Sequence, residues 1–169
     1  NSPENIWGYD IDPVAVKIAR INLYLQFPEM EFGPNVYQKN IIFNYTLGRK
    51  SGIERDFDLI ISNPPWGADL KFEQTNFLKE YYPIIYSFES FSYFLYIGID
   101  LLKENGVLSF ILPESITNIK THKDIRGYLL RNAYLQRVET LGRVFKNVFT
   151  PVIRVDIRKS PAEKEECQI

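Results

Sequence analysis

Residues 57–67 read FDLIISNPPWG. The apolar run FDLIIS is typical of a buried strand, and it ends in an asparagine, two prolines and a tryptophan. A proline cannot donate to a sheet ladder, and it holds the residue before it in an extended conformation. Asn63 and Pro64 are therefore predicted to lie in a stiff, non-helical loop whose backbone carbonyls stay available. The alternative interpretation of an isolated Asn-Pro is a plain turn after a strand.

The segment upstream of this loop predicts a strand followed by a helix. Residues 6–11, IWGYDI, form a short apolar run that suits a buried strand. Asp12 and Pro13 then supply a helix N-cap and a proline at the first helical position. A stripe at helical spacing follows and is expected to pack against the sheet; it comprises Val14, Ile18, Ile21 and Leu25. Residues 35–43, NVYQKNIIF, offer a weaker third strand.

The segment downstream continues the alternation of strands and helices. Its expected elements are an active-site loop or partial helix at 67–87, a helix at 87–103, a strand at 107–112, a helix near 122–132, a strand near 134–141 and an antiparallel strand at 152–158. This alternation predicts a doubly wound, Rossmann-like α/β sheet. Ligands bind beyond the carboxyl ends of the strands in such sheets. One rim should therefore gather Asp10, Asn40, Asn63–Trp66 and Pro113–Ser115.

The composition is that of a globular domain without a metal or disulfide framework. Of the 169 residues, 45% are hydrophobic, and no apolar stretch reaches the ~20 residues of a membrane span. Neither a signal peptide nor a membrane partner is expected, and a cytoplasmic location fits. Cys167 is the single cysteine and lies in a polar tail, so no metal site is expected. His122 stands among lysine and threonine residues, which favours a solvated surface histidine over a ligand or base.

Charge is distributed unevenly along the chain. Residues 1–113 carry 9 basic and 14 acidic side chains, whereas residues 114–160 carry 10 basic and 4 acidic ones, for a net charge of +6. Such a basic segment can face a polyanion, although a solvated face of helix and loop explains any single charge equally well.

The NPPW loop suits the methylation of a planar amine. The lone pair of an exocyclic amino group, such as that of adenine, is delocalised into its ring, so the nitrogen is a poor nucleophile. Two acceptors on its two hydrogens would stabilise the positive charge that develops during attack on an electrophilic methyl group. The side-chain oxygen of Asn63 and the carbonyl of Pro64 are two such acceptors. Trp66 offers a face on which an extruded base could stack, worth about 1 to 3 kcal/mol.

NPPW after an apolar strand, preceded by IWGYDIDPVAVKIARINL and followed by VLSFILPESI, resembles the amino-group DNA methyltransferases of restriction-modification systems, the adenine-N6 branch in particular. The resemblance spans about residues 6–158, and residues 142–159 resemble the closing hairpin region of those enzymes. It implies S-adenosylmethionine as cofactor and double-stranded DNA with a flipped adenine as partner.

The resemblance also implies roles for individual residues. The catalytic loop comprises Asn63, Pro64, Pro65 and Trp66. Asp10, followed by Ile11, matches the acid that holds the ribose hydroxyls of the cofactor, and a carboxylate can accept both hydroxyl hydrogens. Asp12 is better explained as the helix N-cap. Asn40 falls where the family places a polar residue near the adenine of the cofactor, and Asn63 also borders the cofactor.

Phe145 matches an aromatic residue that packs on the side of the flipped base opposite Trp66. The alternative is an ordinary core phenylalanine, because Val144, Val148 and Phe149 crowd the same region.

The sequence departs from the family pattern at its start. The family places a strand and a glycine-rich turn upstream of IWGYDID, and none of the nine glycines here forms a G-x-G. We therefore expect residues 1–159 to be a partial methyltransferase catalytic domain, residues 160–169 a polar tail, and the missing upstream strand and a target recognition domain to be partners in the longer protein. Because the missing strand would lie between those ending at Asp10 and Ser62, its loss should leave exposed edges. We therefore expect a rearranged sheet, a filled gap or an intermolecular contact rather than an intact seven-stranded sheet.

Two other classes of function remain open. A planar amide poses the same electronic problem as an aromatic amine, so a methyltransferase for a protein glutamine or an RNA base is one alternative. A noncatalytic binding module that retains the fold is the other.

Overall fold

The structure is a computed structural model that describes residues 2–46, 52–67, 72–145 and 150–159. The chain divides into two compact units, Asn1–Glu54 and Arg55–Ile169. The predicted tail at 160–169, with Cys167, lies outside the described residues, as do Val148 and Phe149.

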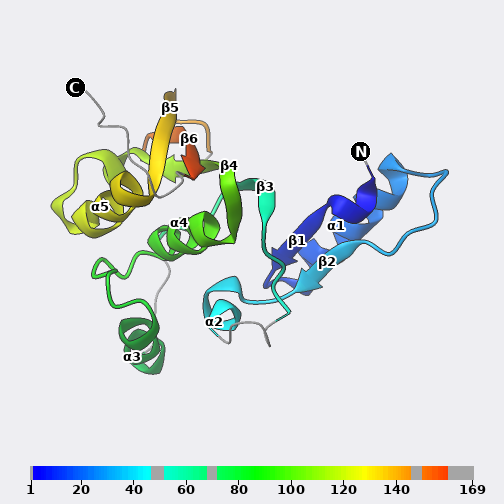
Figure 1. Cartoon of the computed structure of the whole chain (residues 1–169), viewed down its shortest axis with the longest axis horizontal. Helices are drawn as coiled ribbons and strands as arrows, with labels where there is room; N and C mark the ends of the chain where they lie inside the picture. The colour runs from blue at the N-terminus through cyan, green and yellow to red at the C-terminus, as the bar shows by residue number, and fades with distance from the viewer. Residues whose placement is uncertain (1, 47–51, 68–71, 146–149, 160–169) are drawn as a thin grey trace. The chain divides into compact units, whose positions relative to one another are not determined.

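The first unit pairs two parallel strands with a helix (Figure 1). Its elements are η1 (Pro3–Asn5), β1 (Trp7–Asp10), α1 (Pro13–Gln26), β2 (Asn35–Gln38) and α2 (Ile41–Tyr45). Asp12 caps α1, because its Oδ1 accepts a hydrogen bond from the backbone N–H of Val14 at 2.8 Å, and Pro13 follows at the first helical position. The predicted N-cap role of Asp12 is confirmed.

The predicted packing of the α1 stripe is wrong. Exposed fractions are 58% for Val14, 54% for Ile18, 56% for Ile21 and 73% for Leu25. The helix turns a different side to β1 and β2, with Val16 buried at 5% exposure and Arg20 Nε donating to the carbonyl of Val36 at 2.9 Å. Because α1 is apolar on more than one side, the spacing of one stripe did not determine which side the two strands cover.

The second unit is a four-stranded sheet with helices. Its elements are β3 (Phe57–Ser62), α3 (Phe72–Tyr81), α4 (Ser90–Leu101), β4 (Leu102–Pro113), η3 (Glu114–Thr117), η4 (Lys120–His122), α5 (Lys123–Asn132), β5 (Ala133–Gly142) and β6 (Val152–Lys159). The strand order is β3-β4-β6-β5; β3 and β4 are parallel, and β6 is antiparallel to both β4 and β5. The predicted antiparallel strand at 152–158 is confirmed.

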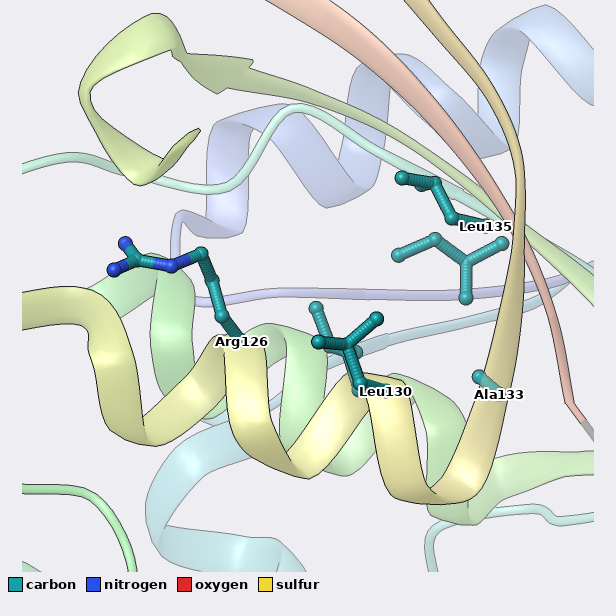
Figure 2. A pocket seen from close by; sticks show the side chains of 6 residues that line it. Arg126, Leu130, Ala133 and Leu135 are labelled. Carbon is teal, nitrogen blue, oxygen red and sulfur yellow. The ribbon is translucent and has the colours of Figure 1, made fainter. Parts of the chain in front are cut away.

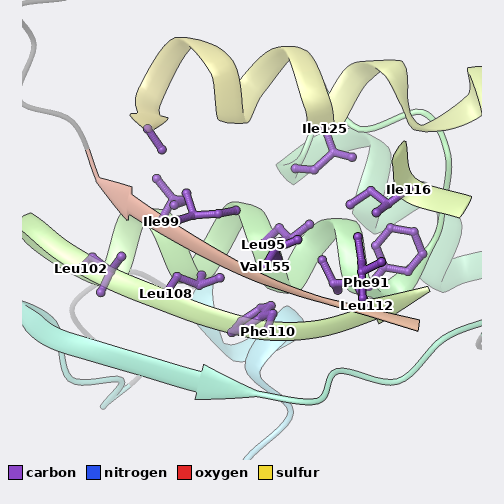
Figure 3. Packing of buried hydrophobic residues seen from close by; sticks show 13 residues of the cluster. Phe91, Leu95, Ile99, Leu102, Leu108, Phe110, Leu112, Ile116, Ile125 and Val155 are labelled. Carbon is purple, nitrogen blue, oxygen red and sulfur yellow. The ribbon is translucent and has the colours of Figure 1, made fainter. Parts of the chain in front are cut away.

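Helices α4 and α5 cover one face of this sheet (Figure 3). Leu108, Phe110 and Leu112 of β4 are at most 2% exposed and pack with Phe91 and Leu95 of α4. Alternate residues of β6 complete the same core; they are Ile153, Val155 and Ile157. The core therefore holds β3 and β4 side by side and fixes the end of the sheet from which the NPPW loop leaves.

The helix α4 lies close to β4 because residue 98 is glycine. A Cβ at Gly98 would lie 2.5 Å from Leu108 Cδ1 and 3.5 Å from Phe110 Cζ. A Cβ at this position would therefore displace the side chain of Leu108, which is held in a close-packed core.

The opposite face of the sheet carries a group of polar side chains. Asp156 of β6 accepts a hydrogen bond from Ser109 Oγ at 2.7 Å, and Arg154 donates to its two carboxylate oxygens at 3.0 and 2.7 Å. The hydrogen bonds from Arg154 and Ser109 lower the pKa of Asp156. This carboxylate is therefore committed to a structural network.

Several expected element limits were wrong. The strand expected over 35–43 ends at Gln38, and Ile41–Tyr45 is helical instead. The fourth helix stops at Leu101, and residues up to Gly106 already belong to β4, although Asn105 has a positive φ of 64°. The active-site loop or partial helix expected at 67–87 contains α3.

The described strands form two sheets rather than one continuous sheet. The described strands therefore form no intact seven-stranded sheet, and the choice between a rearranged sheet, a filled gap and an intermolecular contact stays a prediction.

Candidate active site

The NPPW loop leaves the carboxyl end of β3 and is anchored to the first turn of α4. Ser90 Oγ donates a hydrogen bond to the carbonyl of Pro65, and the backbone N–H of Gly67 donates to Glu89 Oε2 at 3.2 Å. Gly67 has a φ of 63°, a left-handed conformation that glycine adopts without strain. The chain therefore turns sharply after Trp66, and the four residues of the motif are fixed from one side.

The two predicted acceptors carry no competing hydrogen bond. Within the described residues, neither the side chain of Asn63 nor the carbonyl of Pro64 has a hydrogen-bond partner, and Asn63 is exposed whereas Pro64 is buried. Because an acceptor already paired with a backbone N–H would be a weaker acceptor for substrate, this loop fits the chemistry predicted for it.

Trp66 and Phe145 contact each other in the structure, whereas the sequence placed them on opposite faces of a flipped base. Their ring centroids lie 5.8 Å apart at an interplanar angle of 72°, and Trp66 packs against the edge of the core. The Nε1 atom of Trp66 is buried without a hydrogen-bond partner among the described residues. A base held between two rings needs them nearly parallel, so Trp66 and Phe145 would have to reorient to enclose one.

Asp10 lies at the exposed end of β1 with one carboxylate oxygen available. Its Oδ1 accepts from the backbone N–H of Asp12 at 2.8 Å, which shapes the turn into α1. The neighbouring Ile11 is 64% exposed, and its carbonyl accepts from Gln38 Nε2 at 3.2 Å. Because its backbone is fixed and its carboxylate is exposed, Asp10 is suited to accept hydrogen bonds from the two hydroxyls of a ribose.

Asn40 is the N-cap of α2. Its Oδ1 accepts from the backbone N–H of Phe43 at 3.4 Å, a role that the sequence did not predict. Lys39, its neighbour, donates its backbone N–H to the carbonyl of Asp10 at 2.8 Å. Since β1 and β2 are parallel with Asp10 opposite Gln38, Asp10 and Asn40 follow strands that end at the same edge.

The predicted rim is therefore present in two parts. Asp10 and Asn40 share an edge in the first unit. In the second unit, Asn63 follows β3 and Pro113 ends the parallel strand β4, and Ser62 lies opposite Phe110. The convergence of the two parts on one cofactor stays a prediction.

Sequence reasoning missed the residues that position the loop. Ser90 and Glu89 begin α4, and Glu89 is its N-cap residue, although its carboxylate bonds Gly67 rather than the helix. The signal was the polar SFES at 87–90 directly before a long apolar run, a pattern typical of a helix start.

The interpretation of His122 as a solvated surface histidine is wrong. His122 is 5% exposed and meets the ring of Phe91 edge-on at 5.1 Å, while its Nδ1 has no hydrogen-bond partner among the described residues. His122 is the last residue of η4, and it is buried although the nearby Lys120 and Lys123 are exposed. Burial lowers its pKa, an effect that the nearby carboxylates of Glu89 and Asp124 partly offset.

We expect this histidine to make the protein sensitive to acid. Because the folded pKa of His122 lies below its unfolded value, the unfolded state binds a proton more readily. Its contribution to stability is thus complete above about pH 6.5 and is lost as the pH falls below that value. Urea unfolding at pH 7.5 and 5.5 should show a larger loss for the parent than for His122→Gln. Equal losses in the two proteins would contradict the assignment.

A hollow of about 140 Å³ lies between α5 and β5 (Figure 2). Leu129, Leu130, Leu135 and Ile157 give it an apolar lining, with Arg126 at its margin. A nucleoside cofactor needs several polar partners, so this hollow does not fit one.

The described residues contain neither a membrane-spanning helix nor a cluster of metal ligands. None of their helices combines the length and apolarity needed to cross a membrane. Within the same ranges, no three His, Cys, Asp or Glu side chains gather as metal ligands would.

Comparison with solved structures shows the fold. A Listeria monocytogenes protein assigned to the class I S-adenosylmethionine-dependent methyltransferases superposes with a TM-score of 0.70 at 16% identity, covering 96% of this chain and 46% of that protein. The predicted fold class, a doubly wound, Rossmann-like methyltransferase fold, is confirmed.

Comparison of sequences shows the family. The chain is 29% identical over 167 residues to the type II methyltransferase M.VspI of Vibrio sp. (strain 343), covering 99% of this chain and 39% of that protein. It is 33% identical to the type II restriction enzyme and methyltransferase RM.Eco57I of Escherichia coli, covering 86% of this chain and 18% of that protein. The family model described as Eco57I restriction-modification methylase matches residues 4–149. The chain belongs to the Eco57I restriction-modification methylase family.

Proposed function

We propose that the protein carrying this chain transfers a methyl group from S-adenosylmethionine to the exocyclic N6 amine of adenine in DNA, within a restriction-modification system. The observation that carries the proposal is the pair of available acceptors, the side-chain oxygen of Asn63 and the carbonyl of Pro64, on a loop anchored by Ser90 and Glu89. Membership of a restriction-modification methylase family supports DNA as the substrate.

The chain's own residues would act by binding and orientation. S-adenosylmethionine, when bound, supplies a methyl group on a positively charged sulfur that leaves as a neutral thioether. Asn63 and Pro64 would each accept one hydrogen of the amine and so stabilise the positive charge that forms on its nitrogen. The proton is then lost to solvent, so no general base is needed. Asp10 would hold the ribose hydroxyls with its exposed carboxylate.

Trp66 and Phe145 favour an aromatic substrate. Two rings in contact next to the acceptors offer stacking surface for a flipped base, whereas a glutamine amide would leave this surface unused. A methyltransferase for a protein glutamine or an RNA base, and a noncatalytic module, each predict a different result in the transfer assay.

The test is a transfer assay with cofactor labelled in its methyl group. The protein at its natural length is incubated separately with unmethylated duplex DNA, RNA and a glutamine-containing protein mixture, and the digested DNA is analysed by mass spectrometry. We expect label in N6-methyladenine. Label in N4-methylcytosine would overturn the choice of base, label in RNA or protein would overturn the choice of substrate, and no label anywhere would favour the binding module.

A further inference from the structure

A second concave site lies in the second unit. It is a groove of about 710 Å³ between the loop that contains Tyr86 and the segment formed by η4 and α5. Three basic side chains line it: Lys120, Lys123 and Arg131. All three are exposed, and within the described residues none of them forms an ion pair. We name it the basic groove.

The one carboxylate of the basic groove is already engaged. Asp124 Oδ2 accepts hydrogen bonds from the backbone N–H groups of Tyr86 and Ser87, and its Oδ1 accepts from the backbone N–H of Ile125 at 2.7 Å. Asp124 therefore fastens the loop to α5 rather than pairing with a lysine. The groove carries three basic side chains and one carboxylate, and that carboxylate already accepts three backbone N–H hydrogen bonds. The electrostatic potential in the groove is therefore positive.

Gly127 makes room for the third cation. A Cβ at Gly127 would lie 3.3 Å from Arg131 Nη1, so the guanidinium folds back over the one residue of α5 that has no side chain. This arrangement holds the charge of Arg131 in the groove. Tyr86, 73% exposed, adds a hydroxyl donor and an aromatic ring at the margin.

The groove is joined to the NPPW loop by hydrogen bonds. Asp124 holds residues 86 and 87, and two to three residues further on Glu89 and Ser90 hold Gly67 and Pro65. The segment η3–η4 that leads into α5 also starts at Pro113, where β4 ends next to β3. The basic groove thus belongs to the end of the sheet at which the substrate base would be placed.

We propose that the basic groove binds backbone phosphates of the DNA strand beside the target base. The inference rests on the proposed function, because it takes the same nucleic acid as the NPPW loop. Lysine and arginine that neutralise phosphates release condensed counterions, so they contribute affinity without reading sequence. The groove would position the duplex for the loop and leave sequence recognition to other parts of the protein.

The experiment measures the dissociation constant for duplex DNA against salt concentration, using the protein at its natural length. The groove variant combines Lys120→Ala, Lys123→Ala and Arg131→Ala. Each phosphate contact contributes about 0.9 to the slope of log K against log salt for duplex DNA, so we expect the slope to fall by about 2 to 3. Cofactor affinity and the rate of transfer at saturating DNA should not change.

A charge-matched control variant combines Lys17→Ala, Arg55→Ala and Lys103→Ala. Lys17 is exposed on α1, while Arg55 and Lys103 pair with Asp100 and Asp58, with Lys103 and Asp58 at the ends of β4 and β3 opposite the NPPW loop. This variant loses the same formal charge and should keep the parental slope. A groove variant with the parental slope, or a control variant with the same fall, would overturn the proposal.

The two proposals fail in different ways. If the parent protein methylates DNA and the groove variant keeps the parental salt slope, only the phosphate-binding role of the groove is refuted. If the parent protein neither binds nor methylates DNA, both the proposed function and the phosphate-binding role of the groove are refuted. A charge-conserving variant, with Lys120→Arg, Lys123→Arg and Arg131→Lys, should retain the slope, since phosphate contacts need charge more than one particular shape.

Discussion

Replacing Asn63 by alanine is expected to reduce the rate of methyl transfer by at least about 100-fold, the loss typical of removing one preorganised group that stabilises charge in a transition state. The substitution removes the side-chain acceptor and leaves the carbonyl of Pro64 in place. Asn63 is exposed and makes no hydrogen bond among the described residues, so the fold should tolerate the change. Single-turnover transfer to DNA measures the effect.

Asn63→Asp is the matched comparison. An aspartate keeps an oxygen acceptor at the same distance from the backbone, so this variant should retain more activity than Asn63→Ala. The affinity for S-adenosylmethionine, measured by calorimetric titration, should be close to that of the parent in both. Equal transfer rates in Asn63→Ala and the parent would refute the proposed role of Asn63 as an acceptor. A large loss of affinity for S-adenosylmethionine would assign Asn63 to cofactor binding instead.

Replacing Leu108 by alanine is expected to lower the free energy of unfolding by about 2 to 5 kcal/mol, because it empties space in a core that cannot fully collapse. Leu108 is 0% exposed and packs in the cluster that joins α4, β4 and β6. The matched control is Leu135→Ala on β5 of the same sheet, where the side chain is 56% exposed. Urea denaturation of the chain measures both, and similar losses would show that the core lies elsewhere.

Combining Gly98→Ala with Leu108→Ala tests the packing of α4 on β4. A Cβ at residue 98 would lie 2.5 Å from Leu108 Cδ1, so the single substitution should destabilise the chain by overpacking. Leu108→Ala removes the atom that the new Cβ would meet. The double variant should therefore lose less stability than the sum of the two single variants, and strict additivity would contradict the packing of α4 on β4.

Local patterns predicted the bounds of several elements in both units. Residues 57–62 form β3 with the expected bounds, because an apolar run bounded by a charged residue and NPP specifies both of its ends. The expected burial of this strand was wrong, since Leu59 and Ile61 are 54% and 71% exposed. The start of α1 was equally clear, because Asp12 and Pro13 define a helix start by their own chemistry. The end of α4 was not, because Asn105-Gly106 marks an irregular place within β4 rather than the helix stop.

Long-range packing explains what the sequence did not predict. Whether His122 points outward depends on how η4 turns against Phe91, and the lysines beside it carry no information about that turn. The family resemblance placed Trp66 and Phe145 on either side of a base, but their direct edge-on contact depends on packing. Asn40 was matched to the family by its position alone. Its role as an N-cap depends on helix α2, whose apolar residues had suggested a strand.

The uncovered side of α1 has a thermodynamic consequence. Val14, Ile18, Ile21 and Leu25 are hydrated before the chain unfolds, and so are Leu59 and Ile61 of β3, with exposed fractions of 54% and 71%. The heat capacity of unfolding reflects apolar surface that becomes hydrated only in the unfolded state. The heat capacity change per residue is therefore smaller than that of a domain that buries these side chains, and the stability of the chain varies with temperature along a flatter curve.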